Sequence, residues 1–263
     1  MSPLQSERLP LRFLATEPVV ARLREPQGAD ELGVTGIDTR SAVTLLCRLV
    51  QGLPAEADGK PMAADQLAAC DRDALLAALH RMLWGDRIVS SLTCAACGAL
   101  YDLAFELSAV QRQLGGQSEA VRVRRPRCIE SRHGEHWTLP DAAAEEAAAL
   151  HGDAAQRLLA SVTGSDSDAS DRAAVAERLD TLAPLIDIDL STECAECGAA
   201  QRARFDVQSF VMQRLLDERE TVLREVHLLA SGYGWSWQEI AGLPRSLRRS
   251  LVRQFTAKAE SFG

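Results

Sequence analysis

Two short stretches, Cys94-Ala-Ala-Cys97-Gly98-Ala99 and Cys194-Ala-Glu-Cys197-Gly198-Ala199, carry the same motif 100 positions apart. The thiolates of a Cys-x-x-Cys turn can both face one metal ion, and the glycine that follows allows the positive φ that so tight a turn requires. One such turn supplies half of the four-ligand shell that Zn²⁺ prefers in structural sites. We therefore expect one structural zinc ion per chain, bound by Cys94, Cys97, Cys194 and Cys197.

The similarity between these two parts of the chain extends beyond the cysteines. Aligning residues 71–114 with 171–214 without a gap gives 13 identities in 44 positions, among them Ile88 with Ile188 and Phe105 with Phe205. Conservative pairs add to these identities. We infer that the chain contains an internal duplication.

Both copies show the same order of predicted elements: a helix, a short strand, the CxxCG knuckle, a second strand and a further helix. In the first copy the opening helix is expected just after Asp71, a residue suited to capping the free N–H groups of a helix. The alternation in Ile186-Asp-Ile188-Asp-Leu190 predicts an extended strand. We predict an α+β fold, predominantly helical, in which two such units close a shared, zinc-ribbon-like site of four cysteines.

The chain is expected to have four parts. These are an N-terminal tail (1–17), a first repeat with its zinc knuckle (18–116), a second repeat with its zinc knuckle (117–206) and a C-terminal helical extension (207–263). Apolar residues at helical spacing predict one long helix from Val207 to Gly232. Ser236 and Glu239 stand at capping-box spacing and predict the start of another helix.

Composition and charge argue against several classes of protein. The 29 Lys and Arg residues against 37 Asp and Glu residues give a net charge of −8, so nucleic acid is not an expected partner. No apolar run approaches the roughly 18 residues of a membrane span, and the N-terminus lacks the pattern of a secretory signal. Seven cysteines, an odd number, argue against a disulfide framework. We expect a cytoplasmic protein with no membrane partner and no small-molecule substrate.

Other states of the four cysteines remain open: unliganded thiols, a labile disulfide in each pair, or an iron–sulfur cluster. The strands flanking each knuckle and the knuckle glycine favour zinc over these. Four thiolates leave no open coordination position, so we do not expect catalysis at this metal. The sequence also lacks the common nucleotide-binding and nucleophile motifs. We therefore expect a protein that is not an enzyme.

Three other residues need an interpretation. Cys47 lies in an apolar helical stretch and is expected to be buried as a small hydrophobic residue. His133 and His136 do not match the HExxH helix motif and are expected in a polar loop. A hydrolase that uses a metal at these histidines is the less favoured alternative.

Near the C-terminus, the aromatic residues Tyr233, Trp235 and Trp237 are close together in sequence. Such a cluster either fills the corner between two helices or anchors a partner protein, because aromatic residues and arginine dominate interface hot spots. Arg248 and Arg249 of the last helix belong either to a solvated face or to a contact with an acidic partner. We take these five residues as the candidate partner-binding surface.

Three stretches together resemble a known family: Trp84-Gly85-Asp86-Arg87 before the first knuckle, Phe205-Asp206 after the second, and Val226-His-Leu-Leu-Ala-Ser-Gly-Tyr-Gly-Trp235. They are similar to zinc-knuckle proteins encoded with contractile phage tails and extracellular contractile injection systems. That family is grouped with the baseplate and baseplate-hub assembly proteins of contractile-tailed phages. The similarity spans most of the chain from Val19 to Phe255 and is weakest over 110–170.

The resemblance implies a structural or assembly component of a contractile tail machine, with other baseplate and tail proteins as its partners. Such a protein acts in the cytoplasm during assembly and is either released from the finished particle or retained in it. A second interpretation follows from the residues: a zinc-ribbon-like module that binds nucleic acid or a transcription complex. Arg202 and Arg204 supply some of the basic charge that it needs.

Overall fold

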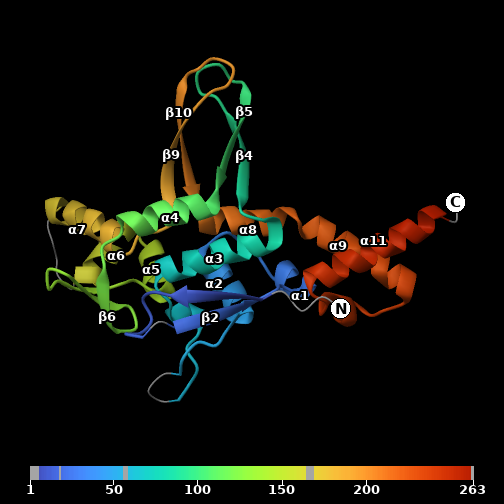
Figure 1. Ribbon diagram of the computed structural model, residues 1–263, viewed down its shortest axis with the longest axis horizontal. Helices are drawn as coiled ribbons and strands as arrows, with labels where there is room; N and C mark the ends of the chain where they lie inside the picture. The colour runs from blue at the N-terminus through green and yellow to red at the C-terminus, as the bar shows by residue number, and fades with distance from the viewer. Residues whose placement is uncertain (1–5, 18, 56–58, 164–168, 262–263) are drawn as a thin grey trace.

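The computed structural model describes residues 6–17, 19–55, 59–163 and 169–261, and its helices and strands are drawn in Figure 1. The elements, in chain order, are β1 (Ser6–Leu11), β2 (Val19–Arg24), α1 (Gly28–Leu32), α2 (Thr39–Leu49), β3 (Val50–Gln51), the 3₁₀ helix η1 (Ala64–Gln66), α3 (Ala69–Trp84), β4 (Arg87–Thr93), β5 (Leu100–Glu106), α4 (Leu107–Gln117), β6 (Val121–Arg125), β7 (Cys128–Ser131), β8 (His136–Thr138), α5 (Ala142–Ala149), α6 (Ala154–Thr163), α7 (Ala169–Leu182), β9 (Asp187–Glu193), β10 (Ala200–Asp206), α8 (Val207–Asp217), α9 (Arg219–Tyr233), α10 (Trp237–Ala241) and α11 (Arg245–Ser261). The prediction of a mixed fold with more helix than strand is confirmed.

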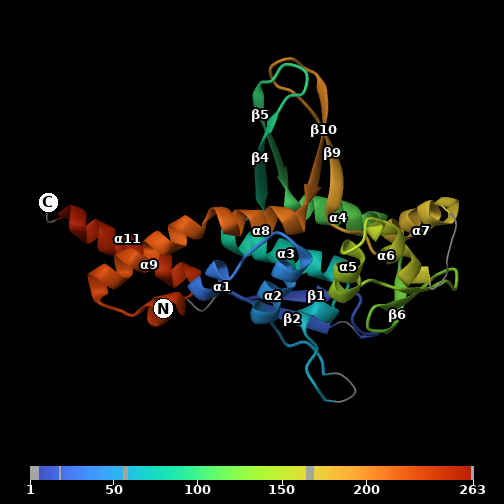
Figure 2. The same ribbon diagram turned by 180° about the vertical axis from the view of Figure 1, so that it is seen from behind.

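Three parts are visible, which we call the body, the stalk and the arm. The stalk consists of the two antiparallel hairpins β4–β5 and β9–β10, which stand side by side on the body in both views (Figures 1 and 2). The arm consists of α9, α10 and α11, which extend sideways from the body. The body holds the remaining helices and two three-stranded antiparallel sheets, ordered β1-β2-β3 and β6-β7-β8.

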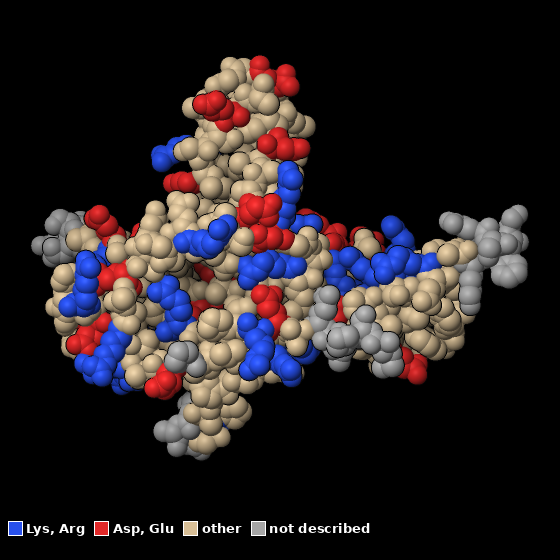
Figure 3. Space-filling view, viewed as in Figure 1, with Lys and Arg blue, Asp and Glu red and all other residues tan. Residues whose placement is uncertain are grey.

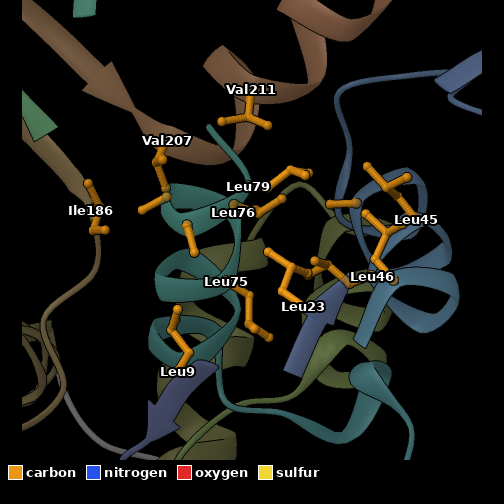
Figure 4. Packing of buried hydrophobic residues seen from close by; sticks show 14 of the residues in the cluster. Leu9, Leu23, Leu45, Leu46, Leu75, Leu76, Leu79, Ile186, Val207 and Val211 are labelled. Atoms are coloured by element: carbon orange, nitrogen blue, oxygen red, sulfur yellow. The ribbon is translucent and has the colours of Figure 1, made fainter. Parts of the chain in front are cut away.

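The main core forms around α3. Its apolar residues recur at helical spacing, so one face of the helix can be buried. Leu75, Leu76 and Leu79 are fully buried there, against Leu23 of β2 and Val211 of α8 (Figure 4). Segments from both halves of the chain therefore share one core.

Part of the predicted N-terminal tail (1–17) belongs to this core, contrary to the prediction, and residues 1–5 of that tail lie outside the described residues. Ser6–Leu11 forms β1, and its alternation places Leu9 and Leu11 against the core while Arg8 is exposed. Asp71 holds the residues that follow β1 in place. This residue does not cap α3, which begins at Ala69; its carboxylate instead accepts hydrogen bonds from the backbone N–H groups of Arg12 and Phe13, at 2.8 and 3.0 Å.

The predicted boundary of the C-terminal extension at residue 207 is also corrected. α8 follows β10 as α4 follows β5, and it packs into the main core through Val207, Val211 and Leu215. The long helix predicted from Val207 to Gly232 is divided at Glu218 into α8 and α9. Of the predicted C-terminal extension, the part from α9 onward, which is the arm, lies outside the body.

Two glycines shape the arm. α9 ends at Gly234, whose φ of 68° is in the left-handed region that favours glycine, and not at Gly232 as predicted. Gly232 has a packing role, because a Cβ there would lie 2.2 Å from Cε2 of Phe255 in α11. The predicted capping box of α10 is confirmed, with the Ser236 N–H bonded to the Glu239 carboxylate at 2.8 Å.

A buried group of charges fastens the arm to the body. The guanidinium of Arg248, with no exposed side-chain area, donates to Glu225 of α9 at 2.7 Å and to Glu31 of α1 at 2.5 Å. Arg245 donates to the same Glu31 carboxylate. Arg248 is therefore not available to a partner, and its assignment to the partner-binding surface was wrong.

Arg248→Met is expected to destabilise the protein by about 3–5 kcal/mol, because it removes the closest counter-charge of buried Glu225 and one of the two guanidinium partners of buried Glu31. Arg249→Met, at the next position and one-third exposed, should cost no more than about 1 kcal/mol. Urea unfolding followed by circular dichroism measures both. Equal losses in the two variants would contradict the role given to the buried pair.

A row of aromatic rings links the foot of the stalk to the arm. His80 of α3 is buried between Trp84 and Phe210, at ring-centre distances of 5.2 and 5.7 Å. Burial, and next the positive charge of Arg214, lower the pKa of His80 from 6.5 to about 4. The folded protein therefore keeps this ring neutral under conditions in which the unfolded chain protonates it.

The sign of the pH effect follows from this shift. Between pH 6.5 and 4 the unfolded state binds the extra proton, so stability should fall on acidification, by roughly 1 kcal/mol per pH unit. Buried Asp73, whose pKa is raised to about 7 by desolvation, acts with the opposite sign, so variants must be compared with the wild type. His80→Gln should make the slope of unfolding free energy against pH less positive than in the wild type between pH 4 and 6.5, whereas His151→Gln, on the surface, should keep the wild-type slope. An unchanged slope in His80→Gln would contradict the assignment.

Candidate metal centre and partner surface

The two knuckles at the tip of the stalk have the same backbone geometry. In each turn the first cysteine donates its N–H to the alanine five residues later, at 2.9 Å from Cys94 and 3.0 Å from Cys194. The N–H of each knuckle glycine bonds back to the carbonyl of that cysteine at 2.9 Å. Gly98 and Gly198 have φ values of 76° and 70°, as the sequence predicted for these turns.

The knuckles bring the four predicted sulfur atoms together. Sγ of Cys94 lies 3.7 Å from Sγ of Cys197, and Sγ of Cys97 lies 3.8 Å from Sγ of Cys194, so each close pair joins one hairpin to the other. All four sulfur atoms lie within 4.8 Å of one another. In a tetrahedron with metal–sulfur distances near 2.3 Å the sulfur atoms are about 3.8 Å apart. The cluster fits one tetrahedral metal ion.

The surroundings favour the charged form of at least one ligand. The backbone N–H groups of Cys97 and Ala96 point toward Sγ of Cys94, the latter at 3.4 Å, and lower the pKa of that thiol to about 7. A thiolate, and not a thiol, binds metal. The backbone of the first knuckle therefore favours the metal-binding thiolate form of Cys94.

Outside the sulfur cluster, the stalk has a thin core. Tyr101 packs against Cys94 and Cys194 near the tip, and the Ala95 N–H donates to the Gln201 side chain of the other hairpin at 3.1 Å. At the foot, the rings of Phe105 and Phe205 meet edge to face at 4.9 Å. Two-stranded hairpins are at best marginally stable alone, so the tip needs a further link between them.

The remaining cysteines and histidines lie elsewhere. Cys47 is exposed on α2, contrary to the expectation that it is buried. His133 lies in the turn between β7 and β8, and the exposed His136 begins β8. Within the described residues, the four cysteines of the stalk form the one group of three or more potential metal ligands.

The aromatic part of the predicted partner surface is partly exposed on the arm. Tyr233 and Trp235 stack at 5.2 Å, with about two-fifths of each side chain exposed, and Trp237 is 49% exposed. Phe255 lies beneath Tyr233 at 6.0 Å. The cluster therefore packs between α9 and α11, as the interpretation of a helix corner predicts. It also presents exposed apolar surface, which the interpretation of a partner anchor requires. Arg249 lies near Glu218 and Glu225 and is one-third exposed.

The contacts of Trp84 that join the body to the arm were not predicted from the sequence. The indole N–H of Trp84 donates to Glu218 at 2.7 Å, and the guanidinium groups of Arg214 and Arg245 lie 4.6 and 5.3 Å from the centre of its ring. The one indication in the sequence was a tryptophan, Trp84, at the end of a predicted amphipathic helix. Its partners are more than 100 positions away, and no local pattern indicates them.

Comparisons of the chain with models of protein families, with curated proteins and with solved structures found no match. Among the described residues, no helix combines the length and apolar character needed to cross a membrane.

Cys94→Ser or Cys197→Ser should abolish metal retention and leave the stalk sensitive to protease, because metal binding supplies much of the folding free energy of small metal-linked units. Cys47→Ser serves as the matched control, since this exposed cysteine is outside the cluster. Elemental analysis after gel filtration and limited proteolysis measure the two effects. A protease-resistant Cys94→Ser variant that still holds one equivalent of zinc would contradict the shared site.

Proposed function

We propose that the four cysteines bind one structural Zn²⁺. The two sulfur–sulfur distances of 3.7 and 3.8 Å support a tetrahedral tetrathiolate site, the geometry that zinc adopts in closed structural sites. Zinc has no geometric preference of its own to oppose this arrangement and undergoes no redox change. Its role here would be to hold two thin hairpins together at their tips.

The two hairpins with their flanking helices are proposed to descend from one duplicated unit. Strand β9 begins 100 positions after β4, β10 begins 100 positions after β5, and α8 begins 100 positions after α4. The identical hydrogen bonds of the two knuckles agree with this origin. A site that needs one turn from each copy is a natural product of such a duplication.

The chain as a whole is proposed to be a structural or assembly component of a contractile tail machine, either a phage tail or the baseplate of a contractile injection system, with no enzymatic role. The observation that carries the proposal is the partly exposed aromatic cluster Tyr233, Trp235 and Trp237 on an arm fixed by buried ion pairs. Fixed aromatic groups bind partners at little entropic cost, which suits a component of an assembly. The resemblance of the Val226–Trp235 stretch to the zinc-knuckle proteins of such machines supplies the context.

The proposed partners are therefore other baseplate and tail proteins, met in the cytoplasm during assembly. Sedimentation of native lysate that carries a tagged copy, with mass spectrometry of each fraction, tests this. Co-migration with sheath, tube and baseplate proteins supports a component of the particle. A tagged protein that stays light but binds tail proteins there supports an assembly factor, and absence of tail proteins from every fraction refutes the proposal.

A zinc-ribbon-like module for nucleic acid is the second candidate, and Arg202 and Arg204 on the outer face of β10 favour it. Arg204, however, is paired with Asp187, and Asp189 and Glu193 are exposed on the neighbouring strand. Such a surface repels a phosphate backbone. A shift of labelled DNA in a gel at physiological salt would favour this candidate over the first.

Trp237→Ala should weaken binding to the tail-protein partner by tenfold or more, since truncation of an aromatic hot spot costs about 2 kcal/mol. Val20→Ala, which removes an exposed apolar side chain from β2 in the body, is the matched control. Circular dichroism establishes that the arm is still helical in both variants. A folded Trp237→Ala variant with unchanged partner binding would exclude this surface.

A further inference from the structure

The tip of the stalk presents an apolar side chain beside negative charge. Leu100 is 72% exposed at the end of the first knuckle, where the second knuckle has Ala200. Glu193 and Glu196 are exposed on the other hairpin at the same end of the stalk, and acidic side chains are visible at the tip in Figure 3. A divalent ion with four thiolates would add a net charge of about −2 at the same place.

A groove on the body has the complementary character. It encloses about 570 Å³ between the β6–β7 turn and two other segments, and its lining includes the apolar residues Leu14, Pro54 and Met62. Arg124, Arg125 and Arg127 also line it. The groove therefore combines apolar surface with concentrated positive charge.

The positive charge of the groove is only partly neutralised. Arg124 is paired with Glu130, and Arg127 with Asp141. Arg125 donates to Sγ of Cys128 at 3.0 Å and has no carboxylate partner among the described residues. The segment 122–132 holds five arginines and one acidic residue in a chain whose net charge is −8.

The tip and the groove of one chain cannot meet. The stalk rises from one side of the body, while β6 and the segment that follows β3 lie on the other side in both views (Figures 1 and 2). A contact between the two surfaces therefore needs two molecules. It would be heterologous, because each molecule offers a different surface, and such contacts build rings or filaments.

We propose that the stalk tip of one copy of this chain binds in the arginine-lined groove of a second copy. Leu100 contacts the apolar residues of the groove, and Glu193 and Glu196 of the tip face Arg125. Glu196 is not needed for the knuckle turn, because Ala96 occupies the same position of the first knuckle with the same hydrogen bonds. The proposal is independent of the proposed role in tail machines.

Sedimentation velocity of the zinc-loaded protein over a range of concentrations tests the proposal. Species heavier than the monomer should appear as concentration rises and dissociate in about 1 M salt, where charge pairs are screened. Arg125→Glu and Glu196→Arg should each weaken self-association at least about tenfold, because each places like charges opposite one another. Glu177→Arg, on the exposed side of α7, is the control for a change of net charge.

The double variant Arg125→Glu/Glu196→Arg distinguishes this contact from general charge effects. If the two residues meet across molecules, the exchanged pair should restore self-association. If they do not meet, the losses of self-association in the two single variants should be additive in the double variant. Leu100→Ala should also weaken association, and Leu150→Ala, equally apolar and 84% exposed, should not. Zinc content and circular dichroism confirm that each variant is folded. A monomer at every concentration, unchanged association in Arg125→Glu, or a double variant no better than the single ones would overturn the proposal.

Discussion

The approach of four sulfur atoms at the tip of the stalk is the constraint on which the upper half of the molecule depends. Each hairpin has only two strands and one apolar face, and neither could hold its shape without the other. The close sulfur pairs each join a cysteine of the first knuckle to one of the second. A metal ion bound at this position would link segments 100 positions apart and fix where the exposed residues of the tip are presented.

The foot of the stalk connects the two hairpins to the body. Each hairpin leads directly into a helix, and α8 packs into the core beside α3. The rings of Phe205, Phe210, His80 and Trp84 then form a continuous row of contacts toward the arm. Buried Arg248 completes the connection by joining α11 to α1 and α9. The exposed aromatic cluster of the arm is thus part of the same packed structure as the metal centre.

The two hairpins share the same backbone geometry and present different surfaces. On the outer face of the first, Val89 and Ala104 lie opposite each other, whereas the corresponding residues of the second, Asp189 and Arg204, are charged. The inner face has remained apolar enough to join the hairpins, and the sulfur ligands are the same in both. The two hairpins differ most where their side chains point outward, at the tip and on the outer faces.

The local features could be predicted from the residues alone: the two knuckle turns with their positive-φ glycines, the four cysteines that could share one ion, the repeated order of elements and the capping box at Ser236. Each depends on residues within a few positions of one another, or on a strict repeat, so spacing and side-chain chemistry were sufficient. Four features became visible in the folded molecule: Arg248 is buried, Ser6–Leu11 is a strand of the core, the helix divides at Glu218, and three distant segments form an arginine-lined groove. These features depend on partners far away in sequence. Whether an arginine is solvated or buried is set by where the matching carboxylates arrive, and no local pattern carries that information.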